Sequence, residues 1–164
     1  MAIINTNPDG ITHNNGEMII TWNSSLNTGI QIIDEQHKHL VNLTNELYQA
    51  CKLGGDVLDA MFKITMSQMV EYVRFHFTFE QNMLQRVKYP KFMEQKVEHD
   101  NLIKTVLEAT KDYADKKSRF VPNNFVRFLR DWIVGHIGHA DKMYAVYILD
   151  LMRKGVISEK DITG

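Results

Sequence analysis

The sequence has little cysteine and almost no net charge. Cys51 is the single cysteine, so the chain can form neither an internal disulfide nor a zinc site built from several thiolates. The 19 lysines and arginines nearly balance the 20 aspartates and glutamates, and the formal net charge is −1. This balance provides no basic surface for nucleic acid or for an anionic membrane, so we expect no partner of either kind.

Long apolar runs are also lacking. A helix that crosses a membrane needs about 20 predominantly apolar residues, and no stretch of this sequence approaches that length, so no membrane span is expected. Residues 1–18 contain neither the basic nor the apolar segment of an export signal. Together with the cysteine usage, this pattern favours a cytoplasmic protein.

What the sequence does contain is typical of one globular domain. Hydrophobic residues make up 44% of the 164 residues and charged residues 24%, which is enough apolar material for a single core. Residues 1–21 are polar and rich in asparagine, and we predict a flexible N-terminal arm there. Residues 22–152 are predicted to form the domain, and residues 153–164 a C-terminal tail.

Four segments place apolar residues at the three- and four-residue spacing of a helix face. These stripes cover residues 33–51, 58–87, 92–113 and 125–151. Short connections between long helices force sequential helices to lie antiparallel. The sequence therefore predicts an all-α fold, an antiparallel up-down-up-down four-helix bundle preceded by an N-terminal arm.

Side chains that commonly bind metals interrupt all four stripes. A polar group on an apolar face raises the free energy of the fold unless something satisfies it, and a carboxylate does so more strongly. One histidine in such a place is usually a satisfied core residue, but four histidines with two carboxylates favour a metal site. The interrupting residues are His37, His76, Glu80, His99, His136 and Asp141.

The spacing of these residues explains part of the arrangement. His76 and Glu80 are four apart, which places an imidazole and a carboxylate on adjacent turns of one helix face. His136 and Asp141 are five apart, or roughly 140° around an ideal helix, so their spacing alone does not pair them.

The types of ligand narrow the choice of metal. Several imidazoles and two carboxylates without a thiolate suit iron, and also manganese or zinc. Two carboxylates able to bridge, with histidines on either side, favour a dinuclear centre. A ferritin-like di-iron site would need the Glu-x-x-His motif on two helices, and no glutamate here is followed three residues later by histidine.

Four blocks of the sequence resemble the successive signature blocks of the bacterial hemerythrins. In order along the chain they are WNSSLNTGIQIIDEQHKHL, HFTFEQNML, YPKFMEQKVEHDNLI and WIVGHIGHAD. The resemblance extends over about residues 22–150. It implies a four-helix bundle that holds two iron ions, bridged by an oxo or hydroxo group, and binds O2 reversibly for storage, transport or sensing.

The resemblance also implies a role for each residue of the centre. It assigns His37 and His76 to the iron that binds O2, Glu80 and Asp141 to the bridges, and His99 and His136 to the other iron. The residues it implies for an apolar O2 pocket are Phe77, Trp132, Ile133, Ile137 and Tyr144.

One position departs from the family pattern. The family's third histidine on the second iron lies four residues before the position of His99, where this sequence has Gln95. Three arrangements are compatible with this change: the amide oxygen binds the iron, a water replaces the imidazole, or that iron is held weakly and lost.

Three functions compete at this stage. The first is reversible O2 binding without catalysis, and no catalytic residue is predicted because no general acid or base stands beside the ligands. The second is a di-iron enzyme that reduces peroxide or nitric oxide at a centre made more accessible by Gln95. The third is a bundle that has lost one metal and serves as an interaction or sensory module.

Overall fold

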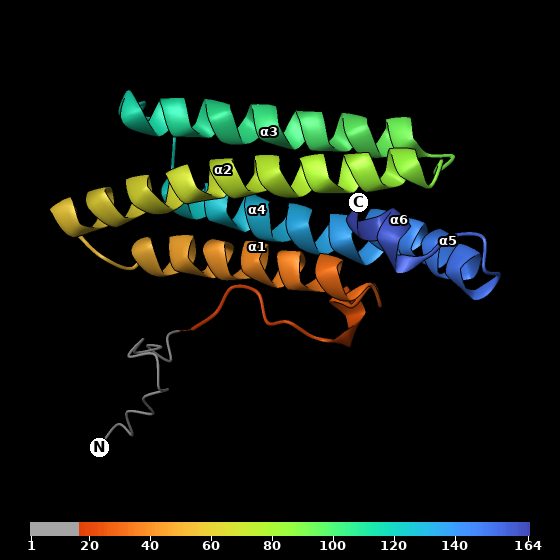
Figure 1. Cartoon of the computed structure of the whole chain (residues 1–164). Helices are drawn as coiled ribbons and strands as arrows, with labels where there is room; N and C mark the ends of the chain where they lie inside the picture. The colour runs from red at the N-terminus through yellow and green to blue at the C-terminus, as the bar shows by residue number, and fades with distance from the viewer. Residues whose placement is uncertain (1–16) are drawn as a thin grey trace, which may run out of the picture.

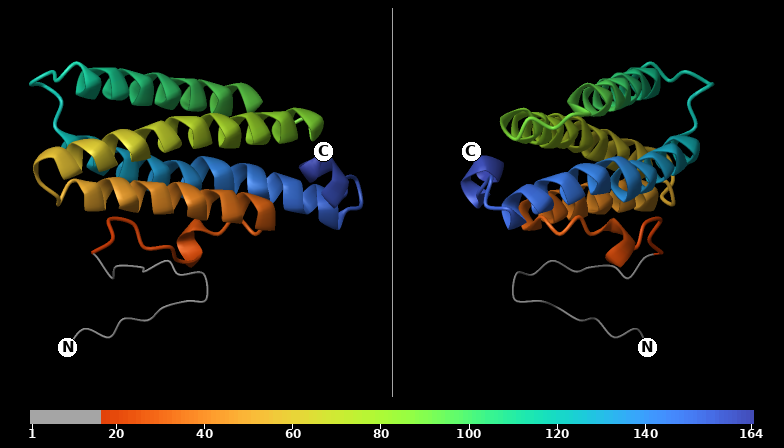
Figure 2. Two further views of the ribbon diagram at one scale, coloured as in Figure 1. Left: turned by 60° about the vertical axis from the view of Figure 1, so that its left-hand side comes forward. Right: turned by 90° about the vertical axis from the view of Figure 1, so that its right-hand side faces the viewer.

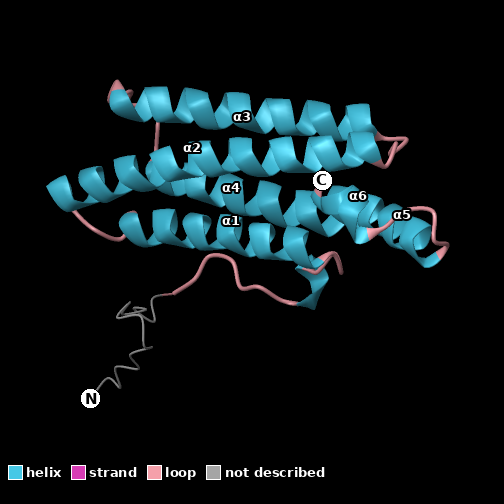
Figure 3. Cartoon of the chain, in the orientation of Figure 1, coloured by secondary structure: helices cyan, strands magenta, loops and turns pink. Residues whose placement is uncertain are grey.

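The computed structural model describes residues 17–164, so residues 1–16 of the predicted arm lie outside the described part. All regular elements of residues 17–164 are helical, and no strand occurs among them (Figure 3). In chain order they are η1 (Ser24–Leu26), α1 (Gln31–Ala50), α2 (Gly55–Arg86), α3 (Phe92–Ala114), α4 (Pro122–His136), η2 (Ile137–Asp141), α5 (Lys142–Arg153) and α6 (Glu159–Thr163).

The long helices form the antiparallel bundle that the sequence predicts. α1, α2 and α3 are the first three members, and α4, η2 and α5 follow one another without a break to make the fourth (Figures 1 and 2). The connections span only residues 51–54, 87–91 and 115–121, which forces each helix to run back along its predecessor. Pro122 begins α4, where its missing N–H costs no hydrogen bond.

The apolar core is divided into two large clusters. One contains the facing residues of α3 and α4 together with Leu40, Leu43, Leu47 and Ala50 of α1 and Phe62, Met66, Met69, Val73 and Phe77 of α2. The other contains Ile33, Met83, Leu84, Tyr144 and their neighbours near the opposite end of the bundle. The predicted metal ligands lie between the two clusters, in a layer that crosses the bundle.

The segment before α1 packs on the bundle. Ile19 and Ile20 both donate their backbone N–H groups to Asn45 Oδ1 at 3.0 Å, and the Ile20 side chain is buried. Part of the stretch that the sequence assigns to the arm is therefore in contact with α1.

The C-terminal segment contains the short helix α6, which packs against α2. Ile162 is buried, and the Arg86 guanidinium donates hydrogen bonds to the backbone carbonyls of Asp161 and Ile162. Over residues 17–164, no helix has both the length and the apolar character needed to cross a membrane.

Candidate metal centre

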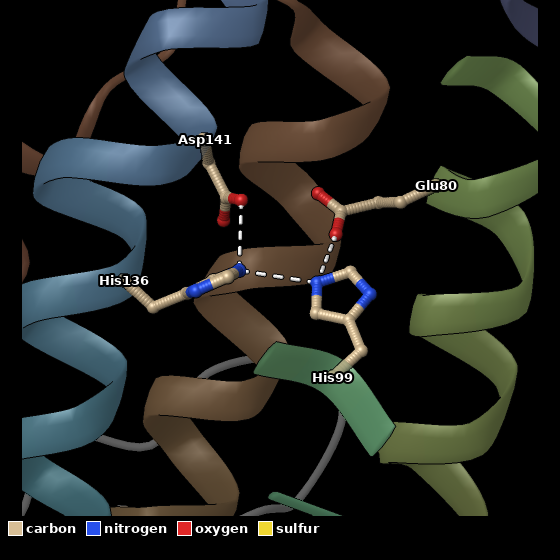
Figure 4. Close-up of side chains that lie close together, drawn as sticks. All are labelled: Glu80, His99, His136 and Asp141. Carbon is tan, nitrogen blue, oxygen red and sulfur yellow. Dashed lines mark hydrogen bonds and ion pairs between the residues drawn. The ribbon is translucent and has the colours of Figure 1, made fainter. Parts of the chain in front are cut away.

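The bundle brings all six predicted ligands into one buried layer. α1 provides His37, α2 provides His76 and Glu80, α3 provides His99, and the fourth helix provides His136 and Asp141. None of these residues is more than 6% exposed. Figure 4 shows four of them, whose side chains point toward one another from three helices.

The ligand atoms form two groups that share one carboxylate. The first group is His37, His76 and Glu80, and the second is Glu80, His99, His136 and Asp141. Within each group the ligand atoms all lie within 4.8 Å of one another. Glu80 belongs to both groups, as a bridging carboxylate would.

Asp141 also faces both sides of the layer. Its Oδ2 is 3.1 Å from His37 Nε2, and its Oδ1 is 3.0 Å from His136 Nε2. Glu80 behaves similarly, with Oε1 at 3.5 Å from His37 Nε2 and Oε2 at 3.3 Å from His99 Nε2 (Figure 4). Asp141 therefore turns one oxygen toward each side of the layer, whereas Glu80 Oε2 also lies 3.6 Å from His76 Nε2 and so faces both sides.

A local change of helix type pairs His136 with Asp141. Residues Ile137–Asp141 form a π-helical turn, in which hydrogen bonds close over five residues instead of four. Across this turn Asp141, five positions after His136, lies about one helical turn further along the same helix face. The sequence rule for an ideal α-helix does not pair these two residues, and the π-turn is the reason that they meet.

The unpaired atoms of the layer fit a bound cation. Among residues 17–164, four buried side-chain atoms make no hydrogen bond of normal geometry, although His37 Nε2 and Asp141 Oδ2 lie 3.1 Å apart: His37 Nδ1, His37 Nε2, Glu80 Oε2 and Asp141 Oδ2. Buried polar atoms are otherwise almost always paired, because leaving one unpaired costs about 1–3 kcal/mol. All four are imidazole or carboxylate atoms of the two ligand groups, and a metal ion would satisfy those that face the layer.

The electrostatics of the layer separate its histidines into two kinds. Burial lowers the pKa of His37, but the carboxylates of Asp141 and Glu80 outweigh it and raise the pKa to about 9. Burial is likewise outweighed at His136, chiefly by Asp141, and its pKa also rises to about 9. At His76 burial dominates and lowers the pKa to about 4. Without a metal, the first two are therefore protonated at neutral pH and His76 is not.

Two residues that support the ligands were not predicted from the sequence. Gln36 Oε1 lies 2.8 Å from His76 Nδ1, and Glu98 Oε2 lies 2.6 Å from His136 Nδ1. Each oxygen accepts a hydrogen bond from the Nδ1–H group and so leaves Nε2 directed at the ligand layer. The sequence offers one signal for these two residues: each directly precedes a predicted ligand, Gln36 before His37 and Glu98 before His99.

Gln95 lies in the layer with its amide nitrogen turned toward the ligands. Gln95 Nε2 donates to Asp141 Oδ1 and is 3.2 Å from His136 Nε2. An amide N–H is a hydrogen-bond donor and cannot coordinate a metal. In this arrangement Gln95 neighbours the second ligand group without adding a ligand atom to it.

The five predicted pocket residues are distributed around the layer. Phe77 stacks on His99 with ring centroids 3.7 Å apart, and Trp132 stacks on His136 at 4.3 Å. Both rings therefore cover histidines that the sequence assigns to the second metal. Ile133 and Ile137 are buried in a third cluster with Val41 of α1, one turn from His37. The Tyr144 hydroxyl is fully buried and donates a hydrogen bond to Glu80 Oε1.

Comparisons with known proteins agree with this geometry. Residues 28–148 match the family model described as the hemerythrin HHE cation binding domain. The chain is 30% identical over 132 residues to a bacteriohemerythrin of Methylococcus capsulatus, covering 77% of this chain and 94% of that protein. It is 29% identical to a bacteriohemerythrin of Clostridium acetobutylicum, covering 77% of this chain and 98% of the relative.

Solved structures show the same likeness in three dimensions. The crystal structure of wild-type hemerythrin matches this fold with a TM-score of 0.71 and 28% sequence identity, covering 77% of this chain and 95% of that chain. The match of the family model covers most of the bundle and every residue of the two ligand groups. The resemblance seen in the sequence is thereby confirmed: this chain belongs to the hemerythrin family.

Proposed function

We propose that this protein holds two iron ions and binds O2 reversibly, for storage, transport or sensing. The observation that carries the proposal is the pair of buried ligand groups sharing Glu80, with four unpaired polar atoms between them. Imidazole and carboxylate ligands without thiolate suit iron, and relatives of this chain are named bacteriohemerythrin.

Two histidines would hold each ion of the centre. His37 and His76 would hold one ion, and His99 and His136 the other, with the bridging carboxylates Glu80 and Asp141 between them. Bound iron would supply the reversible redox chemistry that O2 binding requires. O2 would bind on the side held by His37 and His76, as the family resemblance implies.

The surrounding residues would protect the centre. The Tyr144 hydroxyl fixes Glu80 by hydrogen bonding, while Ile133 and Ile137 exclude water near the His37 side. A dry apolar wall disfavours the separation of charge that would release a reduced oxygen species. No side chain in the layer is assigned a catalytic role.

The experiment is an optical titration with O2. The full chain is loaded with iron(II) without oxygen, and its iron content and spectrum are recorded before O2 is added, after it is added and after it is removed. We expect two irons per chain and an absorption band that appears with O2 and disappears on its removal. His37→Ala should abolish the band, and the matched control His39→Ala, an exposed neighbour on α1, should retain it. If the absorption spectrum of the iron-loaded protein does not change when O2 is added, the proposal is refuted.

A second candidate function is reduction of peroxide or nitric oxide at the same centre. The observation that favours it is Gln95, which leaves the second ligand group one imidazole short. If the protein reduces peroxide with an added reductant and Gln95→His loses this activity, the enzymatic function is favoured over O2 binding.

A cytoplasmic location also belongs to the proposal. Cys51 is the single cysteine of the sequence, and burial raises the pKa of its thiol to about 11. Such a thiol is unreactive at neutral pH, and the chain needs no oxidising compartment to complete its fold.

A further inference from the structure

A cavity opens from the molecular surface toward the Gln95 side of the centre. Its volume is about 90 Å³, and its lining includes Gln95, Glu98, His139, Ala140 and Met143. A water molecule takes up about 30 Å³ in the liquid, so the cavity is large enough to hold water. Gln95 is only 4% exposed, and this residue, which lines the cavity, also contacts Asp141 and His136 through its amide.

The two sides of the centre differ in their contact with solvent. The Glu98 side chain is 53% exposed, and its carboxylate is bonded directly to His136. His37 and His76 are 0% and 1% exposed. The second ligand group therefore lies one side chain away from water, whereas the first group is enclosed.

Gln95 leaves a place for a ligand that does not come from the protein. Its Nε2 donates toward the layer and lies 3.2 Å from His136 Nε2, so the protein supplies no ligand atom where a third imidazole would bind. An oxygen ligand placed there could accept a hydrogen bond from the same amide. Because Gln95 offers a hydrogen-bond donor where the family has an imidazole ligand, a water bound to the metal fits this position better than no ligand at all.

The walls of the cavity select against anions. Glu94 and Glu98 line it, and the Asp141 carboxylate lies beyond Gln95, while Lys91 is the one lysine in the lining. Negative charge at the inner end repels an approaching anion and leaves a neutral molecule unaffected.

We propose that this cavity is an entrance through which a neutral, water-sized protic molecule, water first of all, reaches an exchangeable position on the metal held by His99 and His136. The proposal rests on the proposed function, because it requires a metal in the second ligand group. It gives the centre two unequal positions for exogenous ligands, one enclosed and one in contact with solvent.

The test measures water exchange at the metal without relying on O2 binding. The full chain is loaded with Mn²⁺, its manganese content is determined, and the relaxation rate of solvent water protons is measured per bound ion. A paramagnetic ion accelerates this relaxation when a water bound to it exchanges with the bulk. We expect a high relaxation rate of water protons in the native protein. The rate should fall in Gln95→His, in which an imidazole replaces the bound water.

Blocking the cavity provides an independent arm. Ala140→Met fills it from the turn that carries Asp141, and Met143→Trp narrows it from α5, should the first variant fold poorly. Both should slow the relaxation at unchanged manganese content. Ala60→Met, an exposed alanine on α2, is the matched control and should change nothing.

The outcomes separate this proposal from the one on which it rests. If both ligand groups bind manganese but Gln95→His and the cavity variants relax water as fast as the native chain, the entrance is refuted and the dinuclear centre stands. If the native chain binds no manganese or iron at these residues, the dinuclear centre itself is refuted, and the entrance with it.

Discussion

His136 Nε2 lies 3.0 Å from Asp141 Oδ1, although the two residues are five positions apart on one helix. The π-helical turn over Ile137–Asp141 makes this contact possible. Turns of this kind are rare and are found most often at functional sites. The local backbone of the fourth helix therefore departs from an α-helix at the ligand layer.

Glu80 should be required by both ligand groups, whereas His76 should be required by one. We expect Glu80→Gln to abolish metal binding on both sides, because each group loses a ligand with a full negative charge. His76→Ala should remove only the ion held with His37, and the metal content should fall by half. Metal analysis of the purified variants checks this, with Glu71→Gln, an exposed glutamate of α2, as the control. Equal losses in the two variants would contradict the division into two groups.

Metal binding should release protons at neutral pH. The pKa values of His37 and His136 are raised to about 9 in the metal-free protein, so both carry a proton at pH 7 that a metal must displace. His76, with a pKa of about 4, is already neutral and contributes none. Calorimetric titration with Zn²⁺ in buffers of different ionisation enthalpy should show the release of protons at pH 7 and its disappearance near pH 10.

The metal-free protein should be most stable near pH 6.5. Histidines with a raised pKa stabilise the fold fully below their unfolded value of about 6.5, and this contribution is lost as the pH rises through about 9. His76 acts in the opposite sense, because its lowered pKa destabilises the fold between about pH 6.5 and pH 4. Thermal unfolding from pH 4 to pH 10 checks the prediction, since a loss of about 1 kcal/mol lowers Tm by about 3 °C in a chain of this size. A Tm that kept rising above pH 8 would contradict it.

Glu98 should strengthen metal binding on one side only. Its carboxylate accepts a hydrogen bond from the Nδ1–H group of His136, and the loss of such a support typically lowers metal affinity about 10- to 100-fold. We expect Glu98→Gln to weaken the second ligand group and to leave the His37 side unchanged. Competition with a chromophoric chelator would show one weakened ion of the two, and Glu94→Gln on the same helix is the control.

Tyr144 and Tyr147 form a matched pair for a test of hydrogen bonding. The buried Tyr144 hydroxyl donates to the charged Glu80, whereas the Tyr147 hydroxyl donates to the neutral backbone carbonyl of Val87 at 3.0 Å. Hydrogen bonds to charged groups contribute about 1.5–3 kcal/mol and neutral ones about 0.5–1.5 kcal/mol. Urea unfolding of the metal-free protein should therefore show a larger loss in Tyr144→Phe than in Tyr147→Phe, and the reverse order would refute the assignment.

The sequence predicts the bundle and most of its ligand layer because helical periodicity is a local property. Apolar spacing identifies the four helices, and the same spacing places His76 with Glu80 on one face. The pairing of His136 with Asp141 lies beyond such reasoning, since a π-turn follows from tertiary contacts and not from spacing.

The supporting residues are harder to predict for a similar reason. Gln36 and Glu98 touch histidines on other helices, at sequence separations of 40 and 38 residues. Their function depends on which helix faces meet, and the amphipathic pattern leaves that choice open. Phe77 illustrates the same point, because it follows His76 in the chain but stacks on His99.

The layer of ligands between two apolar clusters also makes metal supply a determinant of how long the protein survives in the cell. Four buried atoms lack partners when no metal is bound, and they lie where the two halves of the core adjoin. A ligand that binds only the folded chain lowers the fraction unfolded, and proteases act on that fraction. Cells short of metal should therefore contain less of this protein at the same rate of synthesis, so that its abundance follows the element it carries.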